Sequence, residues 1–149
     1  MERKSLNLGT NTNLEKKDKM NLESPIVNLN KSAQYIFEAL CDVKNYEKLM
    51  PENIAKFEVT DEDCFIFGLS GMPEIKLRMK DKLPNNSIVL GAASDKLPFT
   101  LTSKIESISD QECTVGLFFE GEFNAMMAMM IKGPINKFLE NLSGNMHKL

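Results

Sequence analysis

The change of hydrophobic period along the chain constrains the fold most strongly. From residue 54 to residue 119, apolar and polar residues alternate as they do in strands that bury one face. The clearest case is residues 75–80, where Ile75, Leu77 and Met79 alternate with three basic residues. Short turn signals separate these runs and leave no room for helices between them. Because parallel neighbours need a long crossover, we predict six antiparallel strands here.

A helical period that is dense in methionine follows the strands. Residues 123–142 read FNAMMAMMIKGPINKFLENL, with four methionines within residues 126–130. We predict a helix over residues 124–146 and expect Pro134 to kink it, because proline removes one helical hydrogen bond. The part before Gly133 is apolar nearly all round, so we expect it to be covered on two sides or to lie near something that can cover it.

The N-terminal part has a different organisation. Residues 1–20 are polar and without period, which predicts a disordered tail in front of one folded domain over residues 21–149. One hypothesis is that Met20, just before the first structured segment, is the natural first residue of the protein and that the preceding residues are an upstream extension. Residues 22–29 are typical of a strand. Residues 33–40 and 46–50 predict two short helices, and Pro51 ends the second.

Charge and cysteine content narrow the possible partners and the compartment. The formal net charge is −3, and residues 21–149 hold 13 basic and 18 acidic side chains. That balance argues against nucleic acid and against an anionic membrane surface as the main partner. No apolar run approaches the roughly 18 residues of a transmembrane segment. The three widely spaced cysteines predict free thiols in a reducing compartment, the cytoplasm.

Residues able to carry out chemistry are few. His147 is the single histidine and lies near the end of the helix, so we predict neither a metal site nor a cofactor site. The cysteines are expected to be buried and inert. The strand carboxylates fall at outward positions or turns: Glu58, Glu74, Glu106, Glu120 and Glu122. The polar candidates for a cavity are Ser103, which has inward parity, and the hydroxyls of Tyr35 and Tyr46 at its mouth.

The order strand, two helices, six strands and one long helix resembles the SRPBCC, or START-like, superfamily. The resemblance is carried by SPIVNLNKSAQYIFEALCDVKNYEKLMPE, residues 24–52, and by the closing methionine-rich helix. It implies an α+β helix-grip fold. In this fold a seven-stranded antiparallel sheet wraps around a long C-terminal helix, with two short helices after the first strand. It also implies an apolar cavity between sheet and helix.

The inward parity of the strands and the helical stripe predict the residues that line such a cavity. A lining with few polar anchors suits a hydrophobic ligand that is oriented by shape. The candidates are Phe67, Ile75, Leu77, Met79, Leu90, Phe99, Leu101, Ser103, Ile105, Leu117, Phe119, Met127, Met130, Ile131 and Phe138.

We therefore predict a protein that binds, sequesters or transports a small hydrophobic molecule such as a lipid, an isoprenoid or a polyketide-like compound. The break at Gly133 and Pro134, with the loop of residues 70–73, is expected to form a gate. One alternative is an enzyme of the cyclase or dehydratase kind. The other is an interaction module that serves a chaperone or a membrane quinone system. We expect a monomer or a weak homo-oligomer.

Overall fold

The computed structural model describes residues 16–93 and 98–149. The elements in chain order are β1 (Asp18–Glu23), β2 (Val27–Leu29), α2 (Ala33–Leu40), η1 (Val43–Asn45), α3 (Tyr46–Leu49), β3 (Lys56–Asp61), β4 (Cys64–Gly68), β5 (Ile75–Leu83), β6 (Ser87–Ala92), β7 (Phe99–Ser109), β8 (Glu112–Phe123), α4 (Ala125–Asn145) and η2 (Met146–Lys148). The predicted order of elements is confirmed.

The strands form one antiparallel sheet in the order β1-β8-β7-β6-β5-β4-β3, and β2 also pairs with β8. The six strands that follow the short helices are each paired with the next one along the chain, as the alternation predicted. The expected single first strand is split into β1 and β2, so the sheet contains eight strands rather than seven.

The split in the first strand has a clear hydrogen-bonding reason. Pro25 has no backbone N–H to offer a partner strand. At the break the buried Ser24 hydroxyl accepts a hydrogen bond from the Leu117 amide at 3.0 Å, so this β8 donor stays satisfied, and it donates one to the Pro25 carbonyl at 2.8 Å. From α4, the Ser143 hydroxyl donates to the same carbonyl at 3.1 Å. The break therefore ties the edge of the sheet to the long helix.

The boundary of the predicted tail is wrong by a few residues. β1 begins at Asp18, and Asp18, Lys19 and Met20 pair with Phe123, Glu122 and Gly121 of β8. The polar side chains that suggested a tail are exposed residues of an edge strand. The first fifteen residues of the predicted tail lie outside the described residues.

The helices begin at the side-chain caps that the sequence offers. The Ser32 hydroxyl accepts a hydrogen bond from the Tyr35 amide at 3.0 Å, and the Asn124 side chain accepts one from the Met127 amide at 2.8 Å. α4 is a single helix that continues through Pro134. Because residue 134 has no N–H, the carbonyl of Met130 lacks its usual partner one turn further along the helix.

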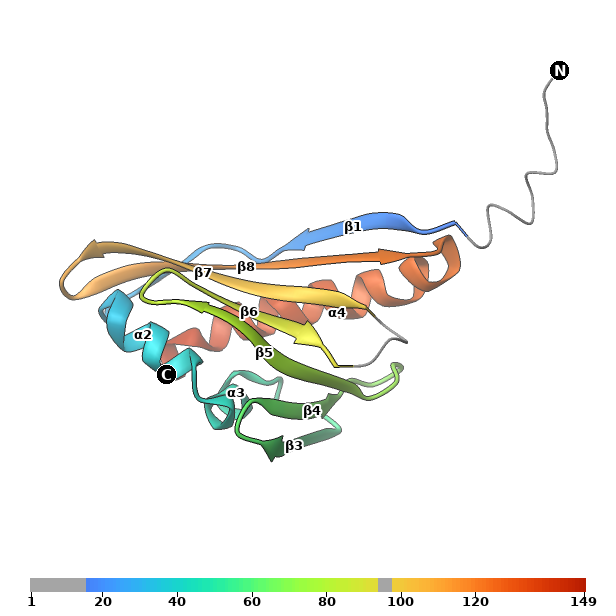
Figure 1. Cartoon of the computed structure of the whole chain (residues 1–149), viewed down its shortest axis with the longest axis horizontal. Helices are drawn as coiled ribbons and strands as arrows, with labels where there is room; N and C mark the ends of the chain where they lie inside the picture. Colours follow the sequence, from blue (N-terminus) through green and yellow to red (C-terminus); the bar gives the residue numbers. More distant parts are fainter. Residues whose placement is uncertain (1–15, 94–97) are drawn as a thin grey trace, which may run out of the picture.

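The long helix lies across the inner face of the sheet, and the two short helices close one end (Figure 1). Its buried stripe is Ile131, Ile135, Phe138, Leu139, Leu142 and Ser143. The sheet bends over the helix with the help of register shifts in β3/β4, β5/β6 and β7/β8. Each shift is typical of a bulge, which increases local twist and curvature. The core therefore lies between the curved sheet and α4.

Candidate ligand-binding site

A pocket of about 340 Å³ opens between the middle of α4 and two loops at the β3–β4 edge of the sheet. It joins the two segments that the sequence predicted as a gate, namely the Gly133-Pro134 step and the loop after β4. It is lined by Pro51, Asn53, Ile54, Leu69, Ser70, Gly133, Pro134, Lys137, Phe138 and Asn141.

Backbone hydrogen bonds hold the two loops that form one side of the pocket. The Ile54 amide donates to the Pro51 carbonyl at 3.1 Å, which closes the turn after α3. The next amide, that of Ala55, donates to Gly68 at 3.1 Å and ties this turn to the end of β4. The Met72 amide donates to Leu69 at 3.1 Å in the second loop. The loops therefore have defined positions opposite the helix.

α4 contributes one face of the other wall. Gly133, Lys137 and Asn141 follow one another at steps of four residues, which places them on one side of a helix. Apart from its chain neighbours and the nearby backbone of its own helix, a Cβ atom built on Gly133 would have no heavy atom within 4 Å, so the glycine leaves open space on its side of the helix. The Asn141 side-chain amide donates to the Lys137 carbonyl at 3.0 Å, which orients it along the helix.

Aromatic rings form the inner end of the pocket. Phe138 of α4 stacks on Phe67 of β4, with ring centroids 4.7 Å apart and planes within 6°. The contact continues from Phe67 to Phe65 at 6.1 Å and from Phe65 to Tyr46 at 5.1 Å. Such stacked pairs stabilise a core beyond their burial alone. These rings fill the space next to the pocket. Rotation of one ring would open part of that space.

Most of the predicted lining residues lie between the sheet and α4. All of them are buried except Met79 and Met127, which are half-buried, and Met130. Of the predicted lining residues, Phe138 alone is part of the pocket wall, and its ring stacks on Phe67. Apart from Ser103 and Met130, the others belong to one hydrophobic cluster.

Met130 is not placed where the sequence predicted. Its side chain is 55% exposed, and Met126 and Met129 are exposed too. The buried stripe of α4 passes through Ile131, and a neighbouring residue lies about 100° away around a helix, so Met130 points away from the sheet. Of the two alternatives predicted for this segment, cover on two sides is not found for these three side chains.

The three polar candidates for catalysis do not line this pocket. The Tyr46 hydroxyl is buried and donates to the Leu40 carbonyl at 2.7 Å, and burial raises the pKa of this phenol. The Tyr35 hydroxyl donates to the Leu149 carbonyl at 3.3 Å, on the far side of α2. Ser103 is buried within the sheet. The two tyrosines therefore satisfy backbone carbonyls and do not lie at the mouth of the pocket.

The predicted outward carboxylates and His147 lie at the surface of the protein. The five outward carboxylates are exposed, and His147 is exposed with its Nδ1 atom 2.9 Å from the Gly144 carbonyl. The three cysteines are free. Cys64 and Cys113 are buried as predicted, whereas Cys41 is half-buried, and burial raises the pKa of all three thiols. Within residues 16–93 and 98–149 no group of three or more His, Cys, Asp or Glu side chains is arranged to hold a metal ion.

A larger hollow, about 640 Å³, lies over the outer face of the sheet. Five of its twelve lining residues are charged: Lys17, Lys19, Lys80, Glu120 and Glu122. The pocket beside α4 has one charged residue, Lys137, among ten. Because an apolar ligand favours walls with few charges, the smaller pocket is the better candidate.

The residues that sequence reasoning missed are those of the pocket rim. Asn53 and Ile54 lie in a turn without period, so nothing in the pattern indicated that they face α4. Lys137 and Asn141 had a usable signal, because their spacing from Gly133 follows one face of the helix.

Solved structures with the same architecture include two enzymes and a protein described only as a START superfamily member. Norcoclaurine synthase from Thalictrum flavum superposes with a TM-score of 0.71 at 12% identity, covering 99% of this chain and 94% of the other. This chain has the helix-grip fold of START-like proteins.

Two further helix-grip structures show how widely this fold extends in sequence. A START superfamily protein from Mycobacterium smegmatis gives a TM-score of 0.63 at 13% identity, covering 87% of this chain and 94% of the other. The Zhui aromatase/cyclase from Streptomyces sp. R1128 gives 0.61 at 11% identity, covering 88% and 95%. At such identities the likeness establishes the fold alone.

Comparisons by sequence add nothing to this helix-grip assignment. No protein-family profile matches the chain, and no curated protein matches it. Within the described residues, no helix is both long enough and apolar enough to cross a membrane.

Proposed function

We propose that this helix-grip protein binds and sequesters a small hydrophobic molecule, such as a lipid, an isoprenoid or a polyketide-like compound. The ligand enters beside Gly133 and Pro134 and lies between the sheet and α4. The observation that carries the proposal is the pocket of about 340 Å³ that ends on the Phe138–Phe67 stack. Burial of apolar ligand surface would supply the affinity, at about 25 cal/mol per Å².

The dimensions of the pocket limit the ligand. Its volume is near the lower end of the roughly 300–1,000 Å³ typical of small-molecule sites. A ligand of one or two rings, or a short chain, fits the pocket as it stands. A longer ligand requires the Phe138 ring to rotate away from Phe67, which would extend the pocket inward.

The rim of the pocket gives the ligand a polar end. Asn53, Ser70, Lys137 and Asn141 line the outer part, while Phe138 closes the inner part. An amphipathic molecule would place its apolar body against the ring and its polar or anionic head near the Lys137 ammonium group. This arrangement favours a fatty-acid-like or phenolic ligand over a pure hydrocarbon.

The gate is the part of α4 that Pro134 weakens. One helical hydrogen bond is missing there, and the adjacent Gly133 lacks a side chain that would pack across the opening. Both features lower the cost of a local change in the helix next to the pocket. The engaged hydroxyls of Tyr35 and Tyr46 support a binding role over a cyclase or dehydratase role.

Native mass spectrometry of protein isolated from its own host tests the proposal. We expect an adduct of defined mass that is released by organic solvent. Protein that is always free of adduct, and that does not bind a panel of fatty acids and phenols, would contradict ligand binding. The free thiols support placing the protein in a reducing compartment such as the cytoplasm.

A further inference from the structure

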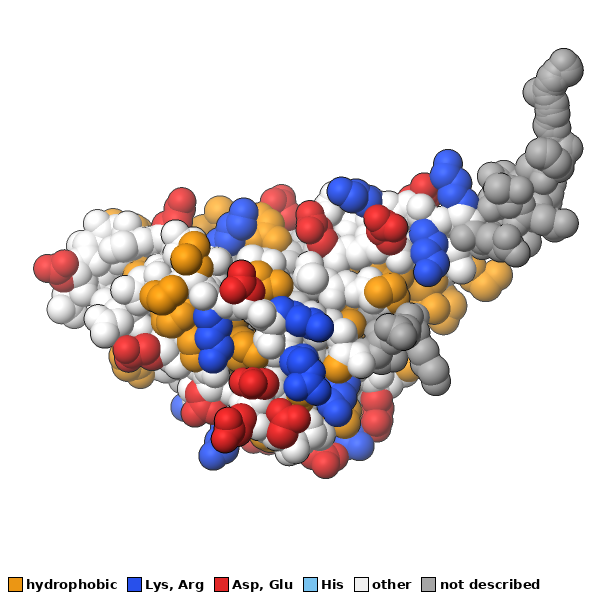
Figure 2. Space-filling view, in the orientation of Figure 1, with side chains coloured by type: hydrophobic (Ala, Val, Ile, Leu, Met, Phe, Trp, Pro, Cys, Tyr) orange, Lys and Arg blue, Asp and Glu red, His pale blue; other side chains and the backbone are white. Residues whose placement is uncertain are grey.

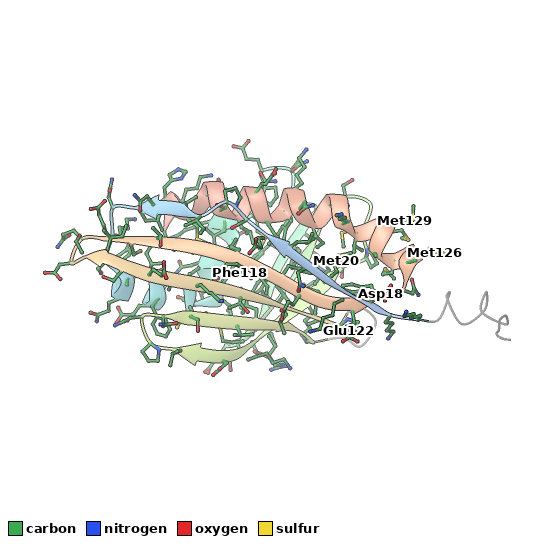
Figure 3. All side chains as sticks on the ribbon, turned by 90° about the horizontal axis from the view of Figure 1, so that it is seen from above. Asp18, Met20, Phe118, Glu122, Met126 and Met129 are labelled. Carbon is green, nitrogen blue, oxygen red and sulfur yellow. The ribbon has the colours of Figure 1, made fainter. Side chains whose placement is uncertain are left out.

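The first turns of α4 carry an exposed apolar cluster that the ligand pocket does not use. The Met126, Met129 and Met130 side chains are 66%, 84% and 55% exposed. We call these three residues the Met patch. Figure 3 shows Met126 and Met129 at the end of the helix that lies beside the start of β1, far from the short helices.

Basic side chains surround the Met patch. A hollow of about 370 Å³ between β1 and α4 is lined by Met129 together with Lys19 and Lys132. Lys16 and Lys17 are exposed directly before β1. Blue and orange side chains meet at this end of the molecule in Figure 2.

Acidic groups are fewer at this end. Asp18 lines the same hollow, and Glu120 and Glu122 line the neighbouring hollow together with Lys17 and Lys19. α4 has no acidic residue in its first turn, and its first carboxylate is Glu140. The unpaired N–H groups of the helix N-terminus add positive potential. The tip is therefore locally basic although the chain as a whole has a formal net charge of −3, so the overall balance that argued against an anionic membrane surface does not describe this end of the molecule.

We propose that the Met patch docks this protein on an anionic lipid bilayer. The methionines enter the boundary between headgroups and acyl chains, while Lys19 and Lys132 contact lipid phosphates. An apolar helix face flanked by lysines is the arrangement that binds a membrane interface. Lysine stems can lie along apolar surface while their ammonium groups reach the headgroups. The acidic remainder of the molecule would be repelled by the surface, which fixes the orientation.

A second copy of the chain fits the Met patch less well. In a two-fold contact the same surface meets itself, so the lysines of one copy would face those of the other. Repulsion between them would oppose the small apolar gain. Lipid phosphates neutralise the same lysines. Methionine also suits a fluid environment, since its unbranched side chain adapts to irregular neighbours.

Vesicle flotation tests this docking, which does not depend on the proposed ligand. The probes are vesicles of phosphatidylcholine alone and vesicles with about 30 mol% phosphatidylserine, in about 0.1 M salt. We expect the wild-type protein to bind the anionic vesicles at least about tenfold more than the neutral ones, and to dissociate in about 0.5 M salt.

Variants distinguish binding through the Met patch from non-specific adsorption to the vesicles. M126Q/M129Q/M130Q keeps helix propensity and should reduce flotation about tenfold. A matched triple at exposed apolar positions elsewhere, I26Q/L83Q/I108Q, should leave flotation unchanged. K19Q/K132Q should abolish the preference for phosphatidylserine, whereas K44Q/K48Q near α3 should not. Far-ultraviolet circular dichroism checks that each variant is folded.

Two outcomes would overturn the proposal. One is a folded wild-type protein that does not float with anionic vesicles, or that floats equally well when the Met patch is replaced. The other is a concentration-dependent dimer, seen by sedimentation, that M126Q/M129Q/M130Q abolishes while flotation is unaffected. That result would assign the Met patch to a second copy. Loss of ligand binding with flotation intact would contradict the proposed function alone.

Discussion

Phe138 of α4 stacks face to face on Phe67 of β4, with centroids 4.7 Å apart and planes within 6°. The two rings join the middle of the long helix to the sheet at the inner end of the candidate pocket. The same pair therefore stabilises the core and sets the depth of the pocket. Any ligand larger than the present space must displace one ring.

Phe138→Ala should deepen the pocket at a cost in stability. Removing a buried phenylalanine ring lowers the free energy of unfolding by about 3–5 kcal/mol. Urea denaturation followed by circular dichroism measures the loss. We expect the variant to bind a fluorescent naphthylamine probe more tightly than the wild type does, because the ring no longer fills the inner space.

Phe118→Ala is the matched control for this prediction. Phe118 is half-buried and lies under the Lys104 ammonium group, 4.9 Å from the ring centroid, away from the pocket. Its replacement should cost less stability and leave probe binding unchanged. Equal probe binding by Phe138→Ala and Phe118→Ala would show that the pocket is not the binding site.

Ser70→Trp should report directly on occupancy of the pocket. The chain has no tryptophan, so a single indole at the exposed rim gives an unambiguous emission signal. A ligand that enters beside Gly133 should shift that emission. Ser109→Trp, at the exposed turn between β7 and β8, should show no response to the same ligand. A response at both positions would indicate non-specific adsorption.

The hydroxyl of Ser24 should matter more than that of Ser143. In Ser24→Ala the buried Leu117 amide loses its acceptor, and an unsatisfied buried donor costs about 1–3 kcal/mol. Ser143→Ala removes one donor to the Pro25 carbonyl and should cost about 1 kcal/mol. Ser107→Ala, whose hydroxyl bond is exposed, should change stability by less than about 0.5 kcal/mol. Urea midpoints in the reverse order would contradict this account of the strand break.

Stability should fall as the solution becomes alkaline. Burial raises the pKa of the Cys64 and Cys113 thiols and of the Tyr46 phenol in the folded protein. Below their ordinary pKa values, 9.0 for the thiols and 10.0 for the phenol, both states keep these protons and the stability is complete. At higher pH the unfolded chain releases protons that the folded chain retains, which favours unfolding.

Urea unfolding at a series of pH values checks this prediction. The free energy of unfolding should be level up to about pH 8 and decrease above about pH 9. Cys64→Ala/Cys113→Ala should flatten the first part of the decrease, and Tyr46→Phe the later part. A wild-type curve that stays level through this range would refute the assignment of neutral buried thiols.

The order of elements could be read from the sequence because it depends on local patterns. Alternation at Ile75, Leu77 and Met79 marks one face of a strand, and Ser32 and Asn124 are the residues that cap the helices. Burial of most predicted lining residues follows from the same parity. These features are set by period and capping, which operate over a few neighbouring residues.

Only the tertiary structure decided the details on which function depends. The sequence could not show that Phe138 meets Phe67, that the Tyr46 hydroxyl is used by Leu40, or that Ser24 satisfies Leu117. It placed Met130 on the inner side, whereas the rotation of α4 that buries Ile131 turns Met130 to the surface. Each of these outcomes depends on contacts between distant segments. Periodicity predicts that a face is buried, but the packing of the sheet on the helix selects which face and which partner.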